Sequence, residues 1–183
     1  EAKLLARFDH PNIVTVKTMG ETSDGEPFFV MPFLEANLLY EIGEDAKNAK
    51  KVGDLLPKWR PRPIAPRRAT DVWRQVLDAL SAIHVAGLVH RDIKPPNVLL
   101  TSKVNGRVKL CDFGMVKVPD ARGSRTGIWI GTLDYISPEQ RKSAAEVDSR
   151  SDVYSAGVLM YRMLSSRLPT DVRAPLRGGR FGI

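Results

Sequence analysis

Apolar side chains recur at helical spacing in two long segments of the chain. Gly87 marks the end of the first predicted helix, whose buried stripe consists of Val72, Val76, Leu77, Leu80 and Ile83. The second helix is predicted over Asp152–Ser165, with an inward face of Val153, Ala156, Gly157, Met160 and Leu164. We expect Thr70 or Asp71 to cap the first helix and Ser151 the second, because their side-chain oxygens can accept free backbone N–H groups.

Short apolar strands, paired as two hairpins, are predicted around these helices. The first hairpin pairs Ile13–Met19 with Pro27–Phe33 through a polar turn that contains glycine. The second hairpin pairs Val98–Thr101 with Val108–Cys111 across an Asn-Gly dipeptide, which is typical of tight hairpin turns. A short helix over Leu38–Glu44 lies between the two hairpins in the sequence.

Length and composition fit a single packed domain. The chain has 183 residues, of which 43% are hydrophobic, so it can bury the core of one domain. No apolar run approaches the ~20 residues of a membrane span, so we expect no membrane segment in this chain. Its single cysteine, Cys111, excludes a disulfide framework and fits a reducing cytosol. We expect a cytoplasmic location, which leaves open a membrane anchor elsewhere in the parent protein.

The net charge of +7 raises the question of a polyanionic partner. Much of the charge falls in Ala46–Arg68, a basic and proline-rich segment that is predicted to form a loop. The segment is either a site for RNA or DNA or a solvated insertion. The sequence shows no zinc-ligand cluster, no aromatic residues interleaved with basic ones and no helix-turn-helix pattern, so we expect no nucleic-acid partner.

Two short motifs carry the candidate chemistry. Residues 90–97 read His-Arg-Asp-Ile-Lys-Pro-Pro-Asn, and residues 112–114 read Asp-Phe-Gly. Together they supply a carboxylate beside a lysine, an amide, and a second carboxylate on a neighbouring loop. These groups are suited to moving a phosphoryl group from a magnesium-bound nucleotide to a hydroxyl.

These motifs resemble those of the protein kinase family, and within it the bacterial eukaryotic-like (Hanks-type) Ser/Thr kinases. Residues 131–139, which read Gly-Thr-Leu-Asp-Tyr-Ile-Ser-Pro-Glu, and the start of the second helix extend the resemblance. It implies an α+β fold with a truncated β-rich N-lobe and a mainly helical C-lobe, incomplete at both ends. The implied divisions are an N-lobe remnant over 1–34, a C-lobe over 35–170 and a disordered tail over 171–183.

The resemblance also implies roles in catalysis. Asp92 orients the substrate hydroxyl, Lys94 neutralises charge on the transferring phosphoryl group, and Asn97 and Asp112 bind Mg²⁺. Thr132 lines the substrate pocket. The cofactors are then ATP and Mg²⁺, and the partners are proteins that present Ser or Thr.

Further residues are implied to bind the nucleotide or to regulate the site. Those assigned to ATP are Glu1, which pairs with a strand lysine in the family, the gatekeeper Met31, the hinge residues Phe33 and Leu34, and Leu99 beneath the adenine. Arg91 is implied to pair with a phosphorylated activation segment, for which Ser124 and Thr126 are the nearest hydroxyls. His90 is expected to pack in a column with Leu5, Val16 and Phe113 that is anchored on Asp152, and Cys111 to be an inert buried thiol.

The sequence lacks two parts that the family places ahead of its first helix, a Gly-rich loop and a strand lysine. We therefore expect the middle portion of a kinase domain, with weak or no activity in this fragment. Two functions remain open. One is ATP-dependent phosphorylation of protein Ser and Thr residues, and the other is a non-catalytic kinase-like scaffold or regulator.

Overall fold

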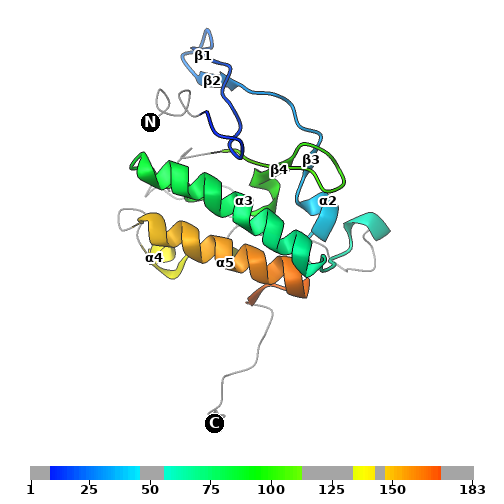
Figure 1. Cartoon of the computed structure of the whole chain (residues 1–183). Coiled ribbons are helices and arrows are strands. Elements are labelled where there is room, and N and C mark those ends of the chain that lie inside the picture. Colours follow the sequence, from blue (N-terminus) through cyan, green and yellow to red (C-terminus); the bar gives the residue numbers. More distant parts are fainter. Residues whose placement is uncertain (1–8, 46–55, 113–133, 143–146, 170–183) are drawn as a thin grey trace.

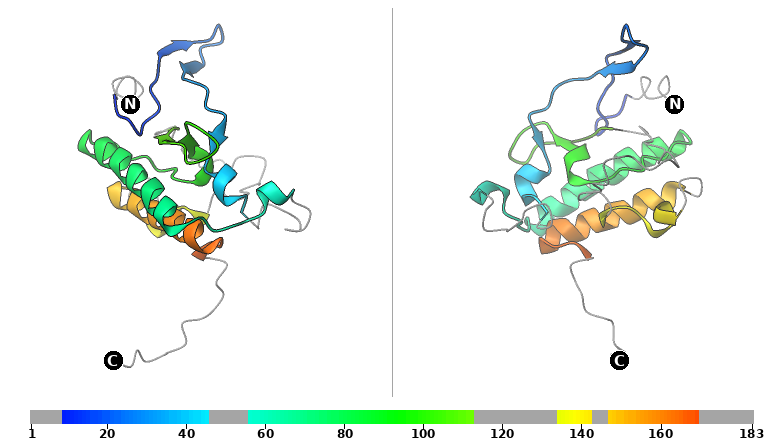
Figure 2. Two further views of the ribbon diagram at one scale, coloured as in Figure 1. Left: turned by 45° about the vertical axis from the view of Figure 1, so that its right-hand side comes forward. Right: turned by 180° about the vertical axis from the view of Figure 1, so that it is seen from behind.

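A computed structural model of the chain describes residues 9–45, 56–112, 134–142 and 147–169. The long helix α3, Pro66–Val85, forms the middle layer of the fold. A small sheet lies on one side of α3 and the helix α5, Ser149–Ser165, lies on the other (Figures 1 and 2). Within the described residues no helix is long and apolar enough to cross a membrane.

Helices α3 and α5 run antiparallel and side by side, as both figures show. The indole Nε1 of Trp73 donates to the main-chain oxygen of Ala156 at 3.0 Å, which joins the two helices near their middles. The predicted stripe of α3 is confirmed at Val72, Val76, Leu80 and Ile83, which are fully or nearly fully buried, whereas Leu77 is only partly buried. Burial of this apolar stripe, rather than intrinsic helix propensity, is what stabilises a helix of this kind.

The sheet beside α3 has the order β3-β4-β5 and is antiparallel throughout. Its strands are short: Ala36–Asn37, Val98–Leu100 and Val108–Leu110. The predicted hairpin between β4 and β5 is confirmed, and its turn contains Asn105 at a φ of 50°. Gly106 follows because a Cβ there would lie 2.4 Å from the main-chain oxygen of Ser102.

A second antiparallel hairpin, formed by β1 (Thr18–Glu21) and β2 (Pro27–Val30), projects away from these layers (Figure 1). The hairpin was predicted, but the predicted strand limits of 13–19 and 27–33 are wrong. Ile13 instead forms an isolated parallel bridge with Leu110, and the main-chain N–H of Val14 donates to the oxygen of Leu110 at 2.8 Å. The first predicted strand thus divides between two different partners, which alternation of side chains alone does not reveal.

The predicted helix caps are wrong at both long helices. α3 begins at Pro66 with Ala65 as its N-cap and has no side-chain cap, because alanine has no oxygen that could accept an N–H; Pro66 at the first position leaves one fewer free N–H to satisfy. In α5 the N-cap is Asp148, whose Oδ1 accepts the main-chain N–H of Arg150 at 2.9 Å. The predicted end of α3 is confirmed, since Gly87 has a φ of 73° two residues after the last helical residue.

The predicted inward face of α5 is also wrong. Val153 is 57% exposed and Leu164 is 42% exposed, and of the predicted residues only Ala156 is buried. The face that is buried carries several polar groups with internal partners, and it consists of Ser151, Asp152, Ser155, Ala156, Val158, Leu159, Arg162 and Met163. A count of apolar positions favoured the wrong face because these buried polar residues do not add to it.

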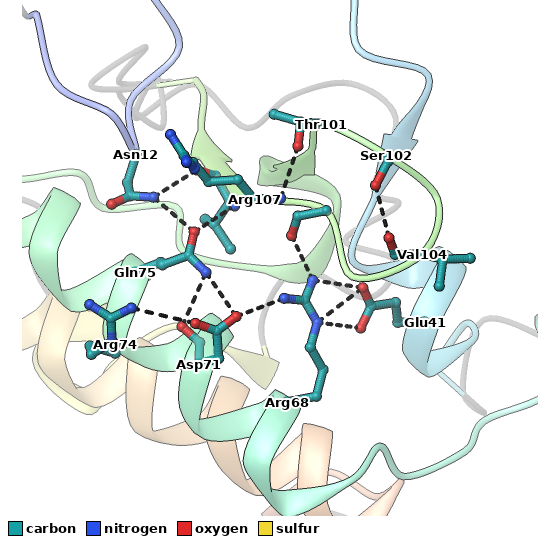
Figure 3. A network of polar contacts seen from close by, with 12 residues as sticks. Asn12, Glu41, Arg68, Asp71, Arg74, Gln75, Thr101, Ser102, Val104 and Arg107 are labelled. Atoms are coloured by element: carbon teal, nitrogen blue, oxygen red, sulfur yellow. Dashed lines mark hydrogen bonds and ion pairs between the residues drawn. The ribbon is translucent and has the colours of Figure 1, made fainter.

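Polar side chains join α3 to the strands (Figure 3). Oε1 of Gln75 accepts the main-chain N–H of Val108 at 2.9 Å and the Nδ2 amide of Asn12 at 3.0 Å. At the start of the helix, Arg68 forms an ion pair at 2.8 Å with Glu41, just before the end of the short helix α2, Leu39–Ile42. The predicted short helix is thereby confirmed, and it is held against α3 by a largely buried ion pair.

A buried guanidinium near the C-terminal end of α5 holds that helix against the end of α2. Arg162 of α5 is 1% exposed, and its Nε lies 2.6 Å from Oδ1 of Asp45, which also accepts the hydroxyl of Tyr135. Its Nη2 donates to the main-chain oxygens of Ile42, Gly43 and Glu44, which follow or end α2. One guanidinium group thus satisfies the carbonyl groups that the short helix leaves free.

We expect Arg162→Met to destabilise the chain by about 3–5 kcal/mol, because it leaves the buried carboxylate of Asp45 without its cation. The double variant Arg162→Met, Asp45→Leu should be less destabilised than Arg162→Met alone, since no buried charge then lacks its partner. Urea denaturation at pH 7.5 measures both. Arg150→Met, which breaks an exposed ion pair on the same helix, is the matched control and should leave the unfolding midpoint nearly unchanged. Equal losses in the single and double variants would contradict the expectation.

Candidate active site

Three of the predicted catalytic side chains meet in the loop between α3 and β4. Nζ of Lys94 lies 2.7 Å from Oδ2 of Asp92. The Nδ2 amide of Asn97 donates to the main-chain oxygen of Asp92 at 2.8 Å and to its Oδ2 at 2.9 Å. The short 3₁₀ helix η4, Pro95–Asn97, brings the amide back to the aspartate, because it folds the chain over within a few residues.

These contacts fix the direction of the Asn97 amide. The Nδ2 amide donates twice to Asp92, so the carbonyl oxygen Oδ1 faces away from that residue. Asn97 itself is buried, and its main-chain oxygen accepts the N–H of Cys111 at 3.1 Å. Asp112 comes directly after Cys111, so it lies one residue from a contact with Asn97. Its backbone is in the left-handed conformation, with a φ of 59°.

The available oxygen atoms fit a magnesium ion. Oδ1 of Asn97 and the carboxylate of the exposed Asp112 are hard oxygen donors, which Mg²⁺ prefers, and Mg²⁺ usually takes the rest of its shell from water and phosphate. Within the described residues there is no group of three or more His, Cys, Asp or Glu side chains that could hold a metal. A site of one amide, one carboxylate and nucleotide oxygens needs no such group.

Asp152 of α5 holds the backbone of this loop in place. Its carboxylate is fully buried, and it accepts the main-chain N–H of His90 and that of Arg91, both at 2.8 Å. Nε2 of His84 in α3 lies 2.7 Å from the same carboxylate. Arg91 has a φ of 68°, which is costly for a residue with a Cβ and persists only where the surroundings fix it.

The contacts of His90 assign its tautomer. The main-chain N–H of Asp92 donates to Nδ1 at 3.3 Å, so Nδ1 carries no proton, and Nε2–H donates to the main-chain oxygen of Cys111 at 3.0 Å. Desolvation by burial lowers the pKa of His90 below its ordinary value of 6.5, although Asp152 and Asp92 act in the opposite direction. The neutral ring thus links the loop of residues 90–97 to the segment that leads from β5 to Asp112.

The thiol beside this site is inert, as predicted. Cys111 is buried, and its Sγ lies 3.5 Å from the main-chain oxygen of Asn97. Burial, together with the charge of Asp112, raises the pKa of Cys111 to about 12. The protonated thiol is a poor nucleophile, so Cys111 serves as a packing residue here.

The residues assigned to the adenine site are exposed or only half-buried. Phe33 is 88% exposed and Met31 is 40% exposed, whereas Leu34 and Leu99 are half-buried. All four remain predictions as nucleotide contacts. Glu1, Ser124, Thr126 and Thr132 lie outside the described residues, as do Leu5 and Phe113 of the predicted histidine column.

Part of the predicted basic loop is used inside the chain. Arg68 pairs with Glu41 and Asp71 at 2.8 and 2.9 Å. Arg62 donates to the main-chain oxygens of Tyr40 and Lys58, so it holds the chain that leads into α3 against α2. These two arginines have internal roles, and residues 46–55 of the segment lie outside the described part.

Sequence reasoning missed two contacts that fix the site from outside. The amide Nε2 of Gln140, in the short helix α4 (Pro138–Lys142), donates to the main-chain oxygen of Arg91 at 2.7 Å. Glu139 beside it accepts the hydroxyl of Ser151 at 2.7 Å. The Ser-Pro-Glu motif drew attention to this helix, but no spacing in the sequence indicates a contact between positions 91 and 140.

Known proteins share this architecture and these motifs. The family model described as the protein kinase domain matches residues 1–175. The chain is 39% identical over 180 residues to the serine/threonine-protein kinase pkn2 of Myxococcus xanthus, covering 96% of this chain and 20% of that protein. It is 42% identical over 171 residues to the serine/threonine-protein kinase PknL of Mycobacterium tuberculosis, covering 92% and 38%.

Among solved structures, the crystal structure of Rad53 residues 1–466 in complex with AMP-PNP superposes with a TM-score of 0.64. That match has 28% sequence identity and covers 91% of this chain and 37% of the other. The chain belongs to the protein kinase domain family. It spans 20% and 38% of the two curated relatives named above, both of which are bacterial Ser/Thr kinases by name.

The assigned tautomer gives a test of the site. Because the pKa of His90 in the folded chain lies below 6.5, the unfolded chain takes up a proton first as the pH falls. Below about pH 6.5 the contribution of His90 to stability is therefore lost progressively until the folded pKa is reached. Imidazole ¹⁵N spectra should show a neutral ring protonated at Nε2 at pH 7 and still neutral at pH 6.5. Half-protonation at or above pH 6.5 would contradict the assignment.

Proposed function

We propose that this chain is the central part of a protein serine/threonine kinase that transfers the γ-phosphate of ATP to hydroxyl groups of proteins. The observation that carries the proposal is the contact of Asp92 with both Lys94 and Asn97. One loop thus supplies three groups with distinct functions. They are the carboxylate of Asp92, the ammonium of Lys94 and the amide of Asn97, whose oxygen faces away from Asp92. The names of the bacterial relatives support Ser and Thr as the acceptors.

Each side chain has a defined part in this proposal. Oδ1 or Oδ2 of Asp92 accepts the hydrogen bond of the substrate hydroxyl and keeps its oxygen aligned for transfer. Lys94, already 2.7 Å from that carboxylate, stabilises the negative charge that develops on the transferring group. Asn97 and Asp112 would hold Mg²⁺, and the bound cation would offset the negative charge of the phosphates. Thr132 is assigned to the pocket of the substrate hydroxyl.

The remaining assignments concern the nucleotide and its regulation. Met31, Phe33, Leu34 and Leu99 are proposed to contact the adenine, and Arg91 to pair with phosphate on Ser124 or Thr126. The 183 residues contain no Gly-rich loop and no matching strand lysine, so we propose that they bind ATP weakly and transfer phosphate slowly when isolated. The alternative function is that of a non-catalytic kinase-like scaffold or regulator.

Magnesium-dependent nucleotide binding separates the two functions. We expect 5 mM ATP with 10 mM Mg²⁺ to raise the melting temperature of the chain, and Asp112→Asn to remove most of that increase because the cation loses its carboxylate. The matched control is Asp78→Asn, an exposed carboxylate on α3, which should leave the increase intact. Equal increases in all three proteins would show that the cation is not held by Asp112.

Phosphate transfer is tested in the intact protein that contains this chain. Asp92→Asn should lower kcat by at least about a hundredfold, with the KM for ATP changed less than threefold, because the aspartate acts on the hydroxyl and not on the nucleotide. The measurement is incorporation of ³²P from γ-labelled ATP into a Ser- and Thr-rich protein such as casein. Full activity in Asp92→Asn would overturn the proposed role.

A further inference from the structure

The peptide groups on both sides of Arg91 are held from outside the catalytic loop. The N–H of Arg91 donates to Oδ1 of Asp152 in α5 at 2.8 Å, and its C=O accepts Nε2 of Gln140 in α4 at 2.7 Å. These two peptide planes define the φ and ψ of Arg91, whose φ of 68° is in the left-handed region. Asp92 follows directly, so the same two contacts set the direction in which its side chain leaves the loop.

The two helices that supply these contacts are themselves joined. Ser151, next to Asp152 in α5, donates its hydroxyl to Glu139, next to Gln140 in α4, at 2.7 Å. The contacts form a closed ring that runs from Arg91 through Asp152 and Ser151 to Glu139 and Gln140 and back. A closed ring holds its members more rigidly than any single hydrogen bond, because no member can rotate without breaking a second contact.

We propose that Gln140 is a positioning residue for phosphate transfer, acting on Asp92 through the main-chain carbonyl of Arg91. The proposal rests on the proposed function, since it concerns the residue assigned to the substrate hydroxyl. Gln140 does not belong to the group of side chains that meet at Asp92. It acts from a helix, at a position 49 residues after Arg91.

The oxygen atom of the Gln140 amide distinguishes a positioning role from a role in stability. Among the described residues, Oε1 of Gln140 is buried without a hydrogen-bond partner, which disfavours the folded state. If Gln140 served stability, the chain would gain from an acceptor-free side chain of the same length. Gln140 keeps this unsatisfied oxygen while its Nε2 donates to the main chain of Arg91. Its presence is therefore better explained by the positioning of that main chain than by a contribution to stability.

Gln140→Met removes the donor and the unsatisfied acceptor together, with little change in length. We expect the melting temperature to stay within about 2 °C of the wild type or to rise, whereas amide exchange at Asp92 becomes about tenfold faster. Exchange at Val76 in the buried face of α3 should not change. Lys142→Ala, an exposed residue at the end of α4, is the matched control and should alter neither amide.

In the intact protein, Gln140→Met should lower kcat about tenfold, with the KM for ATP within twofold of the wild type, because the nucleotide contacts are untouched. Gln140→Lys, which restores a donor of similar reach, should recover part of kcat. Unchanged Asp92 exchange, or equal acceleration at Val76, would overturn the inference. If the wild type transfers no phosphate, the proposed function fails, and the exchange experiment still decides whether Gln140 holds this loop.

Discussion

The carboxylate of Asp152 is the contact on which the rest of the site depends. It is fully buried in α5, and it accepts two consecutive main-chain N–H groups of the catalytic loop and lies within 2.7 Å of His84 in α3. A buried carboxylate is tolerated only where several donors satisfy it. The loop therefore cannot move away from α5 without leaving this charge unsatisfied, and the position of Asp92 follows from the packing of two helices.

The two long helices thus have more than a packing role. The face of α3 toward α5 is apolar along most of its length, and the two charged residues of the buried face of α5, Asp152 and Arg162, lie toward its two ends. At one end the carboxylate holds the catalytic loop, and at the other the guanidinium holds the residues after α2. The apolar contacts between α3 and α5 fix the positions of these two ends. The interface between the two helices therefore determines both the stability of the fold and the geometry of the site.

How much the sequence revealed differs between local and distant features. The stripe of α3, the Asn-Gly turn between β4 and β5 and the catalytic motif were predictable, because each depends on neighbours within a few residues. The caps of α3 and α5 are also local, but the prediction placed each start a few residues too late, past Pro66 and Asp148. The buried face of α5 was not predictable, because Ser151 and Arg162 gain their partners only from distant segments. Gln140 belongs to this second class, since its partner lies in another element.

The bridge between Ile13 and Leu110 has a mechanical consequence for the N-terminal hairpin. The main-chain oxygen of Asn12 accepts the N–H of Leu110, and the N–H of Val14 donates to the oxygen of Leu110. These two hydrogen bonds fasten the chain to the end of β5, two residues before Asp112. The hairpin of β1 and β2 extends beyond this attachment (Figure 2). The attachment at Ile13 therefore fixes the base of the hairpin to the same strand that leads to Asp112.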